Sequence, residues 1–183
     1  MIQIKLVSEI LKLVPSEKIS VVCRKVELFD EPFQEFVDNM IATLLETNNG
    51  VGLAANQVGS ELAVAVIRPY LHDLKRRDET YVIVNPTYSV RPWTHQLVEE
   101  EGCLSFPGRF EQIPRAKTIE LRAADRTGAI TTTKVHGWLA RILQHEIDHL
   151  NGLVCFSKAA KFDDRLLDKS IRNKRRKHVK AKA

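Results

Sequence analysis

The sequence predicts an α+β fold: a compact single domain in which mixed or antiparallel strands pack around a central helix. Two segments, residues 33–45 and 139–150, have apolar residues at intervals of three and four, which is the period of an amphipathic helix. Between them lie four shorter apolar segments that are typical of β-strands. Because helices and strands do not alternate regularly, α+β fits better than a doubly wound parallel sheet.

The first helix is expected over the apolar stripe from Phe33 to Leu45. Asp30 and Pro32 stand at the beginning of this stripe, and both residue types are typical of a helix start. The run Asn-Asn-Gly at residues 48–50 is typical of a helix end.

The four expected strands follow between the two helices. The segment 68–79 is polar and predicts a surface loop, and the run Asp-Arg-Thr-Gly at 125–128 predicts a turn. The strands themselves are expected at residues 62–67, 81–84, 117–122 and 130–135.

The last helix carries the motif His-Glu-x-x-His at residues 145–149. Residues four apart on a helix lie one above the other, so the imidazoles of His145 and His149 can reach one cation. Glu146 lies beside the pair, where its carboxylate can accept a proton from water. Five residues can match this motif by chance on a solvated helix, but Asn-Gly at 151–152 closes a periodic helix here, which favours a metal site.

Two histidines leave a metal site incomplete, so a third ligand is expected. Upstream, Cys103 follows Glu-Glu-Gly at residues 100–102, and a thiolate is a good ligand for zinc or ferrous iron. A free cysteine is more often a small buried hydrophobe, and from Cys103 alone that alternative is favoured. The downstream candidates all lie in a strongly charged segment: Asp163, Asp164, Asp168 and His178.

Residues 49–59 form a glycine-punctuated segment that runs into an alanine-rich, helix-prone turn. This segment lacks the glycine patterns that bind phosphate. Its glycines would allow the backbone to approach a ligand closely, and Gln57 could present its amide to that ligand.

Taken together, three ordered motifs resemble those of the peptide deformylases. They are Gly-Val-Gly-Leu-Ala-Ala-Asn-Gln at 50–57, Glu-Gly-Cys-Leu-Ser at 101–105 and Gln-His-Glu-Ile-Asp-His at 144–149. The likeness covers about residues 8–156, including shorter matches at 10–15, 85–86 and 113–116. One motif is weak evidence, but three in order at family-like separations are specific. The resemblance implies a metal-dependent hydrolase that removes the N-formyl group from the N-terminal methionine of newly synthesised polypeptides and releases formate.

The resemblance also implies residue roles. Glu146 serves as the catalytic base, and the Gln57 side-chain amide and the Leu104 backbone N–H stabilise the oxyanion. The family generally uses ferrous iron, although zinc, nickel or cobalt can occupy the site. The implied metal ligands are Cys103, His145 and His149.

Substrate contacts follow from the same resemblance. The methionine pocket is expected to be apolar, with Leu104 contributing to its lining. Glu101 is expected to orient a histidine ligand and Asp148 to pair with Arg115, as carboxylates that support metal ligands do. A solvated surface charge is the equal alternative for both carboxylates. The expected substrate-binding residues are Gly50, Val51, Gly52, Glu101, Gly102 and Ile142.

Three residues depart from the commonest bacterial pattern. Phe110 stands where many members carry an arginine that meets the peptide backbone, and Trp138 and Arg141 replace aliphatic residues near the pocket rim. These changes affect preferences beyond the first substrate residue and leave the chemistry alone. For Trp138, ordinary core packing is the alternative.

Composition indicates one globular domain in a reducing compartment. With 183 residues and a hydrophobic content of 44%, the chain can form a packed core, and no apolar run reaches the ~18–20 residues of a membrane span. Its cysteines, Cys23, Cys103 and Cys155, are odd in number and widely spaced, which argues against a disulfide framework. No secretory or transit pattern stands at the N-terminus. We therefore expect a cytoplasmic monomer without a membrane partner, with an organellar or viral origin left open.

Charge divides the chain into an expected catalytic domain, residues 1–168, and a basic C-terminal tail, residues 169–183. The tail holds eight Lys or Arg and no acidic residue; since the whole chain has a formal charge of +5, residues 1–168 carry −3. Formyl-methionine first appears on chains leaving the ribosome, and the tail resembles the basic C-terminal helix of some bacterial deformylases, so contact with ribosomal RNA is expected. A solvated, frayed terminus is the alternative.

Two other classes of protein explain less of the chain. An endopeptidase with the His-Glu-x-x-His motif takes its third ligand downstream, whereas Cys103 lies upstream. A basic nucleic-acid module would explain only residues 169–183. The deformylase interpretation accounts for all three motifs.

Overall fold

The computed structural model describes residues 10–15 and 18–156. The predicted tail at 169–183 and the predicted domain boundary at residue 168 lie outside the described residues. In chain order the elements are α1 (Glu31–Glu46), β1 (Gly52–Ala54), the 3-10 helix η2 (Ala55–Val58), β2 (Val64–Ile67), β3 (Tyr81–Ser89), β4 (Gln96–Cys103), β5 (Phe106–Ala116), β6 (Thr118–Ala124), β7 (Ile130–His136) and α2 (Gly137–Leu150).

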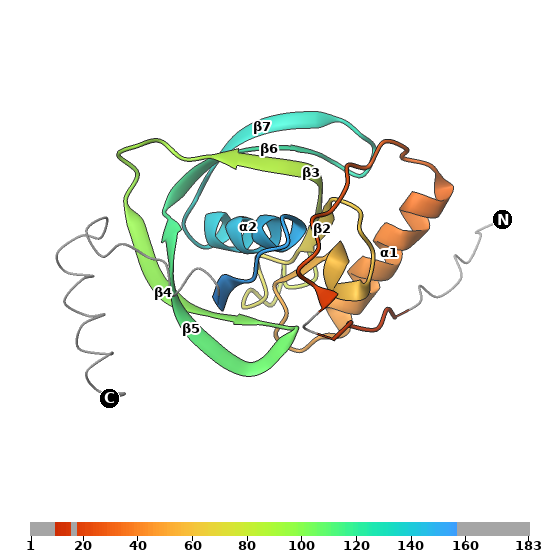
Figure 1. The fold of residues 1–183 in the computed structure, drawn as a ribbon, viewed down its shortest axis with the longest axis horizontal. Coiled ribbons are helices and arrows are strands. Elements are labelled where there is room, and N and C mark those ends of the chain that lie inside the picture. Colours follow the sequence, from red (N-terminus) through yellow and green to blue (C-terminus); the bar gives the residue numbers. More distant parts are fainter. Residues whose placement is uncertain (1–9, 16–17, 157–183) are drawn as a thin grey trace.

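Two antiparallel sheets surround helix α2. One has five strands in the order β1-β2-β3-β6-β7, and the other is the hairpin β4–β5. Figure 1 shows α2 in the middle of the molecule, between strands β3, β6 and β7 on one side and the hairpin on the other. The predicted α+β fold with a central helix is confirmed. Within the described ranges, neither α1 nor α2 has the length and hydropathy needed to span a bilayer.

Helix α1 begins where the sequence predicts because Asp30 caps it. The Asp30 Oδ1 accepts a hydrogen bond from the backbone N–H of Phe33 at 3.2 Å, and Pro32 occupies the first turn. At the other end, the Thr47 hydroxyl donates to the carbonyl of Leu44 at 2.7 Å. The apolar face of the helix packs against β1 and β2 and buries Phe33, Val37, Met40 and Leu44.

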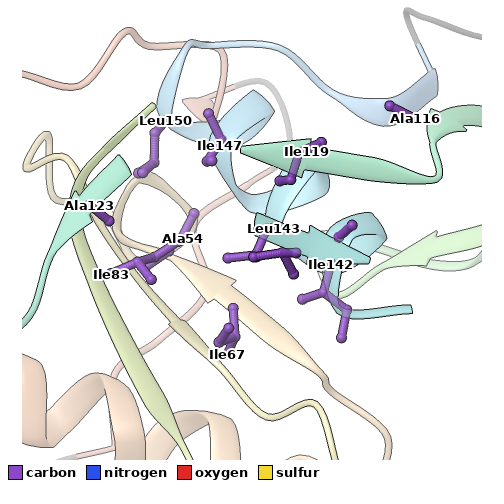
Figure 2. Packing of buried hydrophobic residues seen from close by; sticks show 13 residues of the cluster. Ala54, Ile67, Ile83, Ala116, Ile119, Ala123, Ile142, Leu143, Ile147 and Leu150 are labelled. Atoms are coloured by element: carbon purple, nitrogen blue, oxygen red, sulfur yellow. The ribbon is translucent and has the colours of Figure 1, made fainter. Parts of the chain in front are cut away.

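Helix α2 buries its apolar face against the five-stranded sheet. Figure 2 shows Leu143, Ile147 and Leu150 of the helix among side chains of that sheet. The opposing residues come from β1, β2, β3 and β6: Ala54, Ile67, Ile83, Ile119 and Ala123. Because four strands of the sheet contribute, this core fixes the rotation of α2 about its axis.

Two polar ties fix the position of α2 along its axis. Gln144 pairs with the end of β5: its Oε1 accepts from the N–H of Ala116 at 3.0 Å, and its Nε2 donates to the carbonyl of Ala116 at 2.9 Å. The side-chain amide of Asn56, in η2, donates to the carbonyl of His149 at 2.5 Å. Both ties lie within the turns that carry the His-Glu-x-x-His motif.

All four predicted strands are present, with ends shifted by a few residues, and β3 continues five residues beyond its predicted end to Ser89. The sequence patterns do not predict β1, β4 or β5. Strand β4 contains three successive glutamates, residues 99–101, and so lacks the apolar alternation of a half-buried strand. Strand β5 contains Pro107 and Pro114, which are unusual inside a sheet. Both strands belong to a hairpin that pairs with no third strand among residues 10–15 and 18–156.

Replacing Leu44 by alanine is expected to lower the free energy of unfolding by about 2–5 kcal/mol, because this side chain, 0% exposed, leaves a cavity between α1 and the sheet. Leu74, 85% exposed in the loop between β2 and β3, provides the control: Leu74→Ala should change that free energy by less than about 0.5 kcal/mol. Denaturant unfolding of both variants measures the difference, and equal effects would contradict the packing of α1.

Candidate metal centre

Three side chains from two elements bring one donor atom each to a single place. Cys103 is the last residue of β4, and His145 and His149 lie one turn apart on α2. The Cys103 Sγ lies 3.3 Å from Nε2 of His149, which in turn lies 3.2 Å from Nε2 of His145. All three donor atoms lie within 4.8 Å of one another. The structure therefore brings the predicted ligands together.

The donor set and its spacing fit a divalent transition metal. Ligands at about 2.0–2.3 Å from a tetrahedral ion stand roughly 3.3–3.6 Å apart, close to the separations found here. Burial lowers the pKa of His149 to about 3, so its imidazole is neutral at physiological pH and can ligate a cation. Three protein donors leave a fourth position for water or substrate, which is the pattern of a catalytic site.

A second group of potential ligands, Glu101, His145 and Cys155, fits less well. Burial raises the pKa of the Cys155 thiol to about 12, so this sulfur stays protonated. Both carboxylate oxygens of Glu101 already accept hydrogen bonds from Arg115. We therefore assign the candidate site to the group that contains Cys103.

Glu101 forms the buried support of this site. Arg115 donates to both of its oxygens at 2.9 Å, and the Nδ1 of His145 lies 2.9 Å from Glu101 Oε2. Burial opposes the charge, but the hydrogen bonds from Arg115 and His145 more than offset it and hold the pKa of Glu101 well below its usual range. Arg115 also pairs with Asp148. The expected supporting contacts are present, and the solvated-charge alternative is wrong for both carboxylates because both are buried.

Glu146 is buried against Gly52, the first residue of β1. Its Oε2 is buried and has no hydrogen-bond partner in the part of the chain that is described, and burial raises the pKa of its carboxyl to about 7. A Cβ placed on Gly52 would stand 2.1 Å from Glu146 Oε1. Gly52 is thus needed for the approach of this carboxylate. A carboxyl group with a near-neutral pKa can both accept and release a proton.

Gln57 presents its amide toward the same place. Its Oε1 accepts a hydrogen bond from the backbone N–H of Ala54 at 2.9 Å, which fixes the side chain at the beginning of η2. Its Nε2 donates to the hydroxyl of Ser105 at 3.0 Å and lies 3.6 Å from the Cys103 Sγ. The Gln57 amide nitrogen therefore faces the Cys103 thiol, and its role toward a ligand stays a prediction.

A cavity of about 540 Å³ adjoins the donor atoms. Leu104 lines it together with Glu146, and so does every predicted substrate-binding residue: Gly50, Val51, Gly52, Glu101, Gly102 and Ile142. Phe110 and Trp138 also line it, and they are 52% and 47% exposed. The core-packing alternative for Trp138 is therefore wrong.

Several lining residues carry no recognisable signal in the sequence. Leu71 and His72 come from the polar loop between β2 and β3. Residues 106–109 come from β5, which local patterns do not predict as a strand. Only the folding of these segments around α2 brings them to the cavity.

Three protein donors, a buried carboxylate beside them and an adjoining cavity define the class: a metal-dependent hydrolase. Residues 7–165 match the family described as polypeptide deformylase. The chain belongs to the peptide deformylase family, whose members are metalloenzymes that hydrolyse the N-formyl amide of nascent peptides.

Individual peptide deformylases are similar to this chain over most of their length. The peptide deformylase of Chromobacterium violaceum is 32% identical over 90% of this chain and 95% of its own, and peptide deformylase 1 of Bacillus cereus is 38% identical over 81% and 90%. Among solved structures, the peptide deformylase of Thermotoga maritima has a TM-score of 0.74 at 30% identity and covers 82% of this chain and 97% of its own. A structure from Acinetobacter baumannii, described as bound to Met-Ala-Ser, has a TM-score of 0.72 at 31% identity over 82% and 99%.

Gly52→Ala is expected to lower the free energy of unfolding by about 1–3 kcal/mol, because the added Cβ overlaps the Glu146 side chain. The atoms nearest to that Cβ all belong to Glu146, so the substitution should be better tolerated in a Glu146→Ala background. A double-mutant cycle in denaturant should give a coupling free energy of about 0.5–3 kcal/mol. Additive effects would contradict the close contact between these two residues.

Proposed function

We propose that this chain removes the formyl group from the N-terminal methionine of newly synthesised polypeptides at a divalent metal held by Cys103, His145 and His149. The observation that carries the proposal is the convergence of these three donors with Glu146 beside one cavity. A relative described as bound to Met-Ala-Ser supports it, since a peptide that begins with methionine is the product expected here.

The proposed reaction needs a base and an electrophile. When bound, the metal supplies Lewis acidity, which polarises the formyl carbonyl and lowers the pKa of the attacking water. Glu146 accepts the proton of that water and passes it to the departing amine. The water oxygen joins the formyl carbon, the C–N bond breaks, and formate and a free amino terminus result. A carboxyl pKa of about 7 suits Glu146 to both proton transfers.

Two groups are proposed to stabilise the negative charge that develops on the formyl oxygen. They are the Nε2 amide of Gln57, which faces the donor cluster, and the backbone N–H of Leu104, next to Cys103 in the sequence. Loss of one such donor typically lowers kcat about 10²–10³-fold.

The methionine side chain is proposed to occupy the apolar part of the cavity, against Val51, Leu104 and Ile142. Glycines at 50, 52 and 102 line the same cavity. A Cβ at Gly52 would meet Glu146 and one at Gly102 would meet Phe110, so the missing side chains make room for these neighbours. The exposed rings of Phe110 and Trp138 are proposed to contact substrate residues after the first.

Cys103→Ala should abolish stoichiometric metal binding and turnover of formyl-Met-Ala-Ser together, because two imidazoles alone hold a divalent ion weakly. Glu146→Ala should separate the two properties: metal is retained, while kcat falls about 10²–10⁴-fold. Metal analysis after desalting and steady-state kinetics measure both. A Cys103→Ala protein that retains metal and turnover would refute the ligand set, and a near-normal rate for Glu146→Ala would refute the role of the base.

We propose ferrous iron as the resident metal, with zinc, nickel or cobalt able to substitute. Ferrous iron on a thiolate is sensitive to oxygen, so protein purified without air should contain iron and lose activity on aeration through oxidation of the metal and Cys103. Nickel-loaded or zinc-loaded protein should keep its activity in air. An iron form that stays fully active after prolonged aeration would contradict iron as the sensitive native metal.

We propose a monomeric cytoplasmic enzyme with a catalytic domain at residues 1–168 and a tail at 169–183 that contacts ribosomal RNA. Eight cations without an acidic residue would bind phosphates with a strong salt dependence. Deleting residues 169–183 should abolish co-sedimentation with ribosomes at low salt and leave turnover of a short formyl peptide nearly unchanged. The matched control for tail length is a full-length variant in which the eight Lys and Arg residues of the tail are replaced by glutamine. Equal co-sedimentation of truncated and full-length proteins would refute the proposal.

A further inference from the structure

Arg141 is an unusual residue for the wall of this cavity. It lies on α2 one turn before His145, lines the cavity and is only 3% exposed. A guanidinium stays charged in proteins, and burying it is costly unless every part of it has a partner. The partners of Arg141 therefore indicate what it does.

Every nitrogen of the Arg141 guanidinium has a protein partner. Nε pairs with Glu99 Oε2 at 2.8 Å, and Nη1 donates to Glu101 Oε1 at 2.6 Å and to the carbonyl of Ile113 at 3.0 Å. Nη2 donates to the carbonyl of Leu97 at 2.7 Å. The charged group is thus fully engaged by groups of the protein itself.

These partners lie on both strands of one hairpin. Leu97, Glu99 and Glu101 belong to β4, and Ile113 belongs to β5. Arg141 therefore ties α2 to the hairpin at four points. Cys103 ends β4, two residues after Glu101, so the tie joins the strand that carries the thiol to the helix that carries the imidazoles.

Arg141 also completes the hydrogen bonding of Glu101. The Oε1 of Glu101 accepts from Arg115 Nε and Arg141 Nη1, while its Oε2 accepts from Arg115 Nη2 and is paired with His145 Nδ1. Each oxygen thus has two partners, which is the number of its lone pairs. Without Arg141, one lone pair of the buried Glu101 carboxylate would lose its partner. Arg115 alone would then hold the carboxylate that orients His145.

We propose that Arg141 is a positioning residue that holds the β4–β5 hairpin against α2, and thereby holds the Cys103 thiolate and the His145 imidazole at the separation that one metal ion requires. The proposal rests on the ligand set of the proposed function. It adds to that function the contact between Arg141 and the hairpin, which keeps Cys103 of β4 close to the two histidines of α2.

Arg141→Met keeps an unbranched apolar stem and removes the guanidinium with its ion pairs. In this variant, loss of zinc to a chelator should be about 10–100-fold faster than in the unaltered protein, as for other groups that support metal ligands. In the cobalt-loaded protein, the visible and thiolate charge-transfer bands should shift or broaden because the donors no longer keep one geometry. Arg141→Lys should show the same change in part, since a single ammonium cannot reproduce a planar fork of donors.

Arg126→Met is the matched control. Arg126 also ties two elements, because it lies in the turn between β6 and β7 and pairs with Asp38 at 2.7 Å and with Gln34 Oε1 at 2.8 Å, both on α1. Its loss should lower the thermal midpoint and leave zinc release and the cobalt spectrum unchanged. A purely structural role of Arg141 would give the same result as this control, which would overturn the proposal.

Two further variants keep the outcomes distinct. Cys103→Ala in the same assay should release zinc at once; if it retains zinc, the ligand set fails and not the role of Arg141. If Arg141→Met does not fold, Glu99→Gln removes only the outer ion pair and should give a smaller increase in zinc release with the fold intact. Unchanged release from a folded Glu99→Gln protein together with unchanged release from Arg141→Lys would overturn the proposal.

Discussion

The buried carboxylate of Glu101 joins the elements that meet at the candidate metal centre. It lies on β4, accepts hydrogen bonds from Arg115 of β5 and from Arg141 of α2, and is paired with the Nδ1 of His145. Cys103 lies two residues further along the same strand. A buried charge is tolerated only when opposite charges and hydrogen bonds surround it, and loss of a partner leaves the others uncompensated. The geometry of the donor atoms therefore depends on an ion-pair network as well as on apolar packing.

A second constraint is the space reserved for Glu146. The glycine at position 52 lets this carboxylate lie against β1, and its burial there raises its pKa to about 7. Burial raises the pKa of a carboxyl group because it disfavours the charged form. Keeping the Glu146 carboxylate in this position therefore costs free energy. The large apolar core between α2 and the five-stranded sheet offsets such a cost and keeps the site in place.

Much of this arrangement can be predicted from the sequence, and the remainder depends on contacts between distant segments. The periodic stripes and the caps at Asp30 and Asn151 predict both helices, and the three motifs predict which residues meet at the cavity. The hairpin β4–β5 has no such signal, because three successive glutamates replace the apolar alternation of β4 and one of them, Glu101, serves buried ion pairs. The sequence places Arg141 near the pocket rim. In the structure its guanidinium is buried and donates to carbonyl groups of the hairpin, which local sequence patterns do not predict.

We propose that one thiolate and two imidazoles from two separate elements bind a single metal ion. X-ray absorption spectroscopy at the edge of the metal in the loaded protein tests this most directly. We expect one sulfur neighbour at about 2.3 Å and two imidazole nitrogens at about 2.0–2.1 Å, with the remaining position taken by oxygen. A set of directly bound neighbours that contains only nitrogen and oxygen, or two sulfurs, would contradict the ligand set Cys103, His145 and His149.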